Sequence, residues 1–152
     1  MGSPAVAERD WSSGWTTVRT YTIGTTSYLL LMKRLGVASD GGNMHIYRFN
    51  SDGTIGAQVG SRSWTAGWTG AFVYFVAGHP RLFLLKNGGG RVDLHKFTTD
   101  GKVGQLIKQY DWSSGWDTVE TYTIGADSYL LLLKSLQVDD QMDELSVSGA
   151  HV

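Results

Sequence analysis

The stretch DWSSGWTTVRTYTIGTTSYLLLMK, residues Asp10–Lys33, decides the fold because the chain contains it three times. It returns as Ser63–Lys86 and as Asp111–Lys134, and in every copy the interval from the second tryptophan to the final lysine is 18 residues. The outer copies, compared over 25 positions, differ at only six, whereas the middle copy keeps mainly its tryptophans, glycine, tyrosine, leucines and lysine. An apolar and glycine skeleton that persists through divergence within one chain indicates a repeated architecture.

Length and composition limit the classes of protein to be considered. A chain of 152 residues with 41% hydrophobic and 18% charged residues is typical of a single globular domain. The balance of 13 basic and 14 acidic residues gives a net charge of −1, which shows no electrostatic footprint for nucleic acid or for an anionic membrane. Cysteine is absent, so disulfides and thiolate metal sites are excluded and the compartment stays open. The apolar runs are far too short to span a bilayer, and the first ten residues lack a run of signal-peptide length.

Each repeat reads as four short strands. Residues 15–23 alternate, which places Trp15, Arg19, Tyr21 and Ile23 on one face of a predicted strand. After a turn at residues 24–26, an almost continuous apolar run from residue 28 to residue 33 predicts a strand that is buried on both faces. A third strand over residues 44–49, a hairpin ending in Asp-Gly and a fourth strand over residues 55–63 complete the unit.

The repeats divide the whole chain, residues 1–152, which we treat as one repeat domain. The predicted units are residues 11–63, 64–111 and 112–147, and the last is degenerate because it lacks an Asp-Gly hairpin and a fourth strand. Residues 4–10 loosely match the segment that precedes the second copy, so they are a possible closing strand. A degenerate third strand is expected among the apolar residues that follow Lys134, which are Leu136, Val138, Met142, Leu145 and Val147.

Self-similarity at about 50 residues with four strands per unit predicts an all-β fold, a β-propeller built of four-stranded blades. Three blades do not close a ring, for which about 4–8 are usual. We therefore expect the ring to be completed by oligomerisation, as a homodimer with six blades. The alternative is a β-trefoil, which also builds three four-stranded repeats from a chain of this length and closes as a monomer.

The repeat also carries a resemblance. Trp-x-x-Gly-Trp, an alternating strand, a Tyr-Leu-Leu-Leu strand and an Asp-Gly hairpin together resemble the blades of tachylectin- and tectonin-type β-propeller proteins, over residues 11–134. This resemblance implies carbohydrate binding, with one pocket per blade or per pair of blades. The truncated third repeat departs from the pattern of those families.

The tryptophans are the candidate ligand contacts, because an indole face can stack on the apolar face of a sugar ring. Large buried side chains that lock neighbouring blades together are the structural alternative, since each tryptophan buries about 150–250 Å². The proposed ligand-binding residues are Trp11, Trp15, Trp64, Trp68, Trp112 and Trp116. The predicted function is a lectin-like, non-enzymatic module with repeated, multivalent glycan sites. A structural or protein-interaction scaffold without sugar binding is the competing hypothesis.

Other chemistry finds little support in the sequence. The four histidines, at residues 45, 79, 95 and 151, share no repeat position and no metal-ligand spacing, so no metal site and no cofactor is predicted. No G-x-S-x-G elbow is present, and three similar units do not supply the single asymmetric constellation that catalysis needs. We therefore expect no enzyme activity. Arg19 and Glu120 occupy the same position of the two outer copies with opposite charges. A solvated surface is the favoured interpretation, and the alternative is a joint between subunits where the two charges pair.

Overall fold

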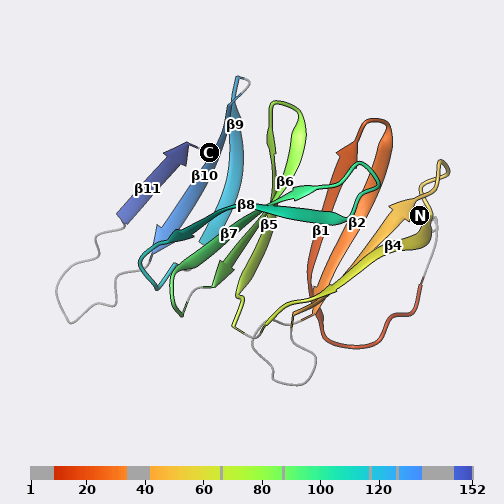
Figure 1. The fold of residues 1–152 in the computed structure, drawn as a ribbon, viewed down its shortest axis with the longest axis horizontal. Helices are drawn as coiled ribbons and strands as arrows, with labels where there is room; N and C mark the ends of the chain where they lie inside the picture. Colours follow the sequence, from red (N-terminus) through yellow and green to blue (C-terminus); the bar gives the residue numbers. More distant parts are fainter. Residues whose placement is uncertain are drawn as a thin grey trace, which may run out of the picture.

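A computed structural model of the chain describes residues 9–33, 42–65, 67–86, 88–116, 118–125, 127–134 and 146–151, without the side chains of residues 127 and 146–151. These residues form three antiparallel sheets and no helix, as Figure 1 shows. Sheet A holds β1 (Trp15–Ile23), β2 (Thr26–Lys33), β3 (Asn43–Phe49) and β4 (Ile55–Ser63). Sheet B holds β5 (Gly70–Val76), β6 (His79–Lys86), β7 (Arg91–Phe97) and β8 (Val103–Asp111). Sheet C holds β9 (Thr118–Ile124), β10 (Asp127–Lys134) and β11 (Ser146–His151).

Each repeat thus forms its own sheet, with its strands in sequence order, and the predicted all-β fold of four-stranded units is confirmed for the first two repeats. Every pairing in the described part of the chain joins strands of one repeat. A β-trefoil needs barrel strands from all three repeats to pair, so these pairings count against it. In the third repeat the third strand is β11, while residues 4–8 and 135–145, which include most of the predicted closing strand and degenerate third strand, lie outside the described residues.

The turns and the second strands follow the sequence closely. Gly53 and Gly101 end the β3–β4 and β7–β8 hairpins with φ of +83° and +86°, a conformation that favours glycine. The Asp52 carboxylate accepts a hydrogen bond from the Thr54 amide at 2.9 Å, which closes the first of these turns. The apolar runs of β2 and β6 are buried on both faces, as predicted, because each sheet packs against a neighbour or an aromatic cover.

The three sheets stack face to face in chain order, with sheet B between the other two (Figure 1). The front face of a sheet is defined here as the side that carries Leu29 and Leu31 in sheet A, Leu82 and Leu84 in sheet B, and Leu130 and Leu132 in sheet C. The opposite side is the back face. One apolar core joins the back of sheet A to the front of sheet B, and a second joins the back of sheet B to the front of sheet C.

One predicted strand face was wrong. The alternation places Trp15 on the same face as Tyr21, but Trp15 packs on the front of sheet A, and Tyr21 lies in the core behind it. The reason is a register shift between Trp15 and Thr17, where the pairing of β1 with β2 skips one residue. An extra residue in one strand moves the side chains before it to the opposite face.

Candidate functional site

The structure places the six candidate tryptophans as three equivalent pairs, each associated with the front face of its own sheet. Trp68 is 3% exposed and belongs to the core between sheets A and B, and its neighbour Trp64 packs against that core. Trp112 and Trp116 pack against the core between sheets B and C. Trp11 and Trp15 cover the front of sheet A, where no further sheet of the described chain follows. Two of the three predicted pairs are therefore elements of sheet junctions, and the third covers an end face of the described stack.

Cationic side chains of the chain itself lie over four of the indole rings. The Arg62 guanidinium carbon lies 4.1 Å from the centroid of the Trp64 ring, within the range of a cation–π contact. The corresponding distances are 5.5 Å for Lys33 over Trp15, 5.7 Å for Arg91 over Trp68 and 5.9 Å for Lys134 over Trp116. The Nε1 atoms of Trp64 and Trp68 are also buried. These four rings act mainly in packing, because a ligand that approached the covered face would contact the cation before the indole.

The lysine that ends each copy of the repeat explains the glycine in front of the second tryptophan. Gly67 has φ of +96°, and a Cβ at that position would lie 2.6 Å from Cε of Lys86. Gly115 has φ of +89°, and its Cβ would lie 3.0 Å from Cε of Lys134. A contact below 3.0 Å requires a neighbour to move, so glycine lets the lysine stem pass along the strand end. The Gly-Trp and Lys of the repeat thus form one structural unit.

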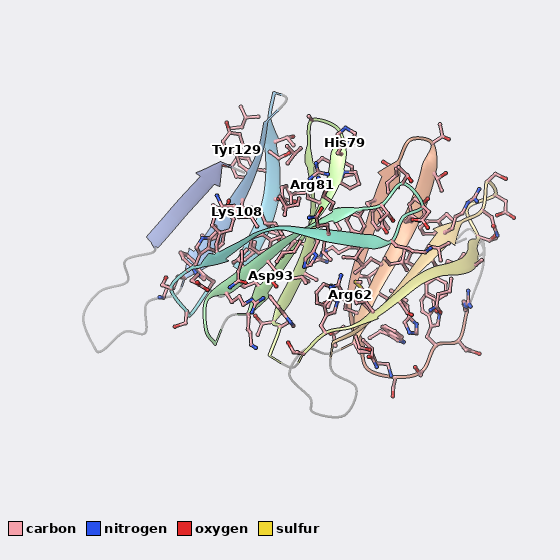
Figure 2. All side chains as sticks on the ribbon, in the orientation of Figure 1. Arg62, His79, Arg81, Asp93, Lys108 and Tyr129 are labelled. Atoms are coloured by element: carbon pink, nitrogen blue, oxygen red, sulfur yellow. The ribbon has the colours of Figure 1, made fainter. Side chains whose placement is uncertain are left out.

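A cleft of about 430 Å³ opens between sheets A and B, next to Trp64. Its apolar lining comes from both sheets, and its polar lining comes from β4 and from the residue that precedes β8. Figure 2 shows Arg62 on the side of sheet A that is turned toward sheet B. The lining residues are Met44, Ile46, Gln58, Val59, Gly60, Ser61, Arg62, Lys102 and Val103. Gly60 leaves room for the stem of Lys102, whose Cγ would lie 3.2 Å from a Cβ there.

The electrostatic character of this cleft is cationic. Its lining contains Arg62 and Lys102 but no carboxylate. Lys102 forms an ion pair with Asp100 at 2.6 Å, and both side chains of this pair are more than half exposed. Hydrogen bonds from Lys102 and from the Thr98 hydroxyl lower the pKa of Asp100 to about 2. An ion pair in this exposed position is weak and exchanges readily, so Lys102 remains able to bind an anion.

A buried polar layer lies behind the cleft on the front of sheet B. Asp93 is buried and accepts two hydrogen bonds from Arg91, both of 2.9 Å. The His95 ring lies 5.1 Å from the Trp64 ring, and its Nδ1 is 3.3 Å from the carbonyl oxygen of Gly104, to which it donates as the neutral tautomer. Burial lowers the pKa of His95, so the ring is neutral at pH 7. This layer orients Trp64 and therefore Arg62.

The front of sheet A carries a comparable column without a sheet in front of it. Trp15 lies 4.8 Å from the His45 ring, and Trp11 lies 5.8 Å from the Tyr47 ring. The Tyr47 hydroxyl donates to Oε1 of Gln58 at 3.2 Å. Burial, followed by the nearby charge of Lys33, lowers the pKa of His45. The column is an aromatic surface with a polar edge rather than an enclosed site.

The polar set of the cleft is not repeated at the next junction. Residues 58, 61 and 62 of β4 correspond to Leu106, Gln109 and Tyr110 of β8, counted from the Asp-Gly hairpins. Sequence reasoning missed Arg62 and Lys102 because it looked for features shared by all repeats. The one available signal was a cation two residues before Trp64, where the other junction has a tyrosine.

The described residues also bear on metal binding and on membrane insertion. Within these ranges no group of three or more His, Asp or Glu side chains could hold a metal ion. No helix long and apolar enough to cross a membrane occurs in the same ranges. Comparisons with protein-family models, with curated proteins and with solved structures find no significant match to this chain.

Proposed function

We propose that this chain is a non-enzymatic carbohydrate-binding protein of β-propeller architecture, and that its site is the cleft between sheets A and B. The observation that carries the proposal is the lining of the cleft, where the cations Arg62 and Lys102 lie beside an apolar floor that includes Met44, Ile46 and Val103. Sugars present hydroxyl groups at their edges and carbon–hydrogen faces between them, so a concave site of this composition suits them.

The charge of the cleft specifies the class of sugar. Two cations without a carboxylate in the lining favour a saccharide that carries its own carboxylate, such as a uronic acid. Arg62 is held in place by the Trp64 ring, which reduces the conformational entropy that it loses on binding. A neutral sugar brings no carboxylate to these cations and is expected to bind more weakly.

The propeller part of the proposal rests on the stacking of the sheets. Consecutive sheets of the chain pack face to face, with contacts between the first strands β1 and β5 and between β5 and β9. Contacts between the first strands of consecutive sheets support a propeller, in which four-stranded blades repeat radially. Because the described residues of each chain form one cleft of this chemistry, multivalent binding depends on several copies in one assembly, which raises avidity by about 10²–10⁴ where the geometry permits.

The test is an NMR titration of the isotope-labelled chain with D-glucuronic acid and, as the neutral match, D-glucose. We expect shifts of the residue 58–62 and 102–103 amides with glucuronic acid and weaker ones with glucose. Replacement of either Arg62 or Lys102 by alanine lowers the affinity by about tenfold, the loss of one charge-assisted hydrogen bond. Lys108→Ala is the control, because Lys108 lies on the central sheet at the other junction, over the Tyr110 ring (Figure 2).

Two outcomes would overturn this proposal. One is the absence of shifts at the cleft with every acidic and neutral sugar of a glycan panel. The other is an equal loss of affinity in the Lys108→Ala control. Trp64→Ala distinguishes the roles of the indole: a folded variant with lost binding supports its place in the site, whereas an unfolded variant shows that it is structural.

A second function is favoured by one observation. Cationic side chains of the chain itself lie over four of the indole rings, so these faces are not free to stack on a sugar. Tryptophans that only pack within a scaffold would be covered in this way. The chain would then be a structural or protein-interaction propeller without sugar binding. A glycan panel without binding, combined with a stable assembly, would favour this second function.

A further inference from the structure

The two ends of the stack carry side chains that are buried wherever a neighbouring sheet is present. Val119, on the front of sheet C, is 3% exposed because sheet B covers it, whereas its equivalent Val18, on the front of sheet A, is 55% exposed. Tyr21, on the back of sheet A, is 3% exposed under sheet B, whereas its equivalent Tyr122, on the back of sheet C, is 40% exposed. The same residues in nearly identical strands therefore differ only in whether a sheet lies against them.

The front of sheet A carries an open hollow in the region that a further sheet would cover. It has a volume of about 630 Å³ and is lined by residues of β1, the two hairpins and the start of β2, among them Ser27, Phe49 and Asn50. The equivalent hollow on sheet B, lined by Pro80, Phe97 and Thr98, measures only about 80 Å³.

The hollow on sheet B is small because Ile23 of sheet A lies in it. Ile124 is the equivalent of Ile23 on sheet C, and it is 62% exposed. The chain thus carries, at its opposite ends, an unfilled hollow and the isoleucine that fills the matching hollow at the internal junction.

We propose that a second copy of this chain is the occupant: the back of sheet C in one copy docks on the front of sheet A in the other, and repeats the internal A/B junction. The inference does not rest on carbohydrate binding, because the docking faces lie at the ends of the stack and the cleft lies inside it. Figure 1 shows the two end sheets on opposite sides of sheet B.

The internal junction supplies the contacts expected at this joint. The Tyr21 hydroxyl donates a hydrogen bond to the carbonyl oxygen of Gly101, and the Tyr21 ring stacks on Phe97 at 4.1 Å. In the joint, Tyr122 occupies the place of Tyr21, and Gly53 and Phe49 of the second copy occupy those of Gly101 and Phe97. Tyr122 is already arranged for this role, since it stacks on Tyr129 at 5.3 Å as Tyr21 stacks on Tyr28 at 5.2 Å.

A second contact at the joint comes from the internal B/C junction. There the Ser128 hydroxyl donates a hydrogen bond across to the carbonyl oxygen of Phe75. Ser27 is the equivalent of Ser128 on the front of sheet A, and Thr123 is the equivalent of Phe75 on sheet C. We expect the Ser27 hydroxyl of one copy to donate to the Thr123 carbonyl oxygen of the other.

Charge complementarity supports the same joint. The Arg19 guanidinium carbon lies 5.1 Å from the ring of Phe72, its equivalent on sheet B, so residues at this position meet across a junction. Glu120 is the equivalent on sheet C. At a joint between the ends, Glu120 of one copy therefore meets Arg19 of the other.

The joint is heterologous, because a C face meets an A face. Such contacts form a ring if the rotation closes and a filament if it does not. Two copies of three sheets give a six-sheet ring with two identical joints, which leaves no open end face. The expected particle has twice the 16.6 kDa mass of the chain.

Solution mass, measured by light scattering over a dilution series, tests the joint. The wild-type chain is expected to be a dimer, and Ile124→Asp and Val18→Asp are each expected to weaken it by about a hundredfold or more, since a buried unpaired carboxylate is costly. Leu106→Asp is the control, because Leu106 is 40% exposed but lies on β8 of the central sheet. Circular dichroism of the monomeric variants establishes that they are folded.

A charge-complementation experiment tests the head-to-tail geometry. Arg19→Glu places two glutamates at each joint and Glu120→Arg places two arginines there, so each variant alone is expected to dimerise about tenfold or more weakly at low salt. An equimolar mixture restores both joints, because each then pairs one glutamate with one arginine. The affinity is expected to recover only on mixing.

Three outcomes would overturn the inference: a monomeric wild-type chain at all concentrations, a dimer that Ile124→Asp and Val18→Asp weaken no more than Leu106→Asp, or single charge variants that do not recover on mixing. None of these outcomes bears on glucuronic acid binding in the A/B cleft, so failure of the joint and failure of the sugar site are distinguishable.

Discussion

The Tyr21 hydroxyl donates a hydrogen bond to the carbonyl oxygen of Gly101, across the junction of the first two sheets and 80 residues along the chain. The carbonyl belongs to the Asp-Gly turn between β7 and β8, and Gly101 itself lies against the ring of Tyr28. Burial raises the pKa of Tyr21, so the hydroxyl stays protonated and remains a donor. The Asp-Gly turn that recurs in the first two repeats is therefore also part of the packing between sheets A and B.

Gly101→Ala is expected to destabilise the fold more than a turn glycine normally would. A Cβ at residue 101 would lie 2.2 Å from Cε1 of Tyr28, so a loss of about 3 kcal/mol is expected from overpacking together with the positive φ. Gly78→Ala is the control, because φ is +76° there but nothing lies within 4 Å, and about 1 kcal/mol is expected. Urea denaturation measures both, and equal losses would contradict the packing role.

The two ion pairs of sheet B are expected to differ in their contribution to stability. Arg91→Ala leaves the buried carboxylate of Asp93 without its two hydrogen bonds, so a loss of about 2 kcal/mol is expected. Lys102→Ala removes only an exposed contact to Asp100, for which a clearly smaller loss is expected. Chemical denaturation of both variants decides the point, and a larger effect of Lys102→Ala would show that the Asp93 layer is not structural.

Stability is expected to fall as the pH drops below about 6.5, the ordinary value for histidine. Burial lowers the pKa values of His45 and His95, so the unfolded chain takes up protons in this range before the folded chain does. The contribution is fully present above pH 6.5 and is lost as the pH falls through the folded pKa values. His95→Gln is expected to reduce this slope in denaturation measured at pH 7 and pH 5, and the exposed His79→Gln serves as the control. An unchanged slope in His95→Gln would refute the assignment.

Trp68→Ala is expected to cost about 3–5 kcal/mol, the range for removing a large aromatic side chain from a core. Trp68 belongs to the core between sheets A and B, whereas the equivalent Trp15 is only partly buried on the front of sheet A. Trp15→Ala is therefore expected to cost the folded monomer less than Trp68→Ala. Thermal unfolding at concentrations where the chain is monomeric gives the comparison, and the reverse order would contradict the burial of the two rings.

Much of the architecture could be predicted from the repeat. The intervals between tryptophans and Asp-Gly turns predict the four strands of sheets A and B, because strand alternation and turn chemistry are local properties. The doubly buried strand was predicted because an unbroken apolar run leaves no polar face. The face of Trp15 could not be predicted, since one skipped residue in the pairing reverses it and a skipped residue has no signature in the alternation itself.

The candidate site was harder to predict than the fold. Tryptophans are conspicuous in the sequence, yet the cleft is lined by Gln58, Ser61 and Arg62 of one repeat and Lys102 of the next. Residues so far apart become neighbours only through the stacking of sheets. A search for positions shared by all repeats passes over them, because a site at one junction needs no counterpart at the other.

By itself the sequence determined that the chain is a repeat of short strands, where they turn and which of them are buried, because these properties depend on periods of two residues and on glycines at fixed intervals. Only the tertiary structure decided which faces of the sheets meet and which remain uncovered. Val18 and Val119 lie in the same strand of nearly identical repeat copies, with Thr17 and Thr118 before them, and the differences nearby, such as Arg19 against Glu120, are between polar residues. Their exposures differ because burial depends on the sheet that lies opposite, and that neighbour comes from elsewhere in the chain.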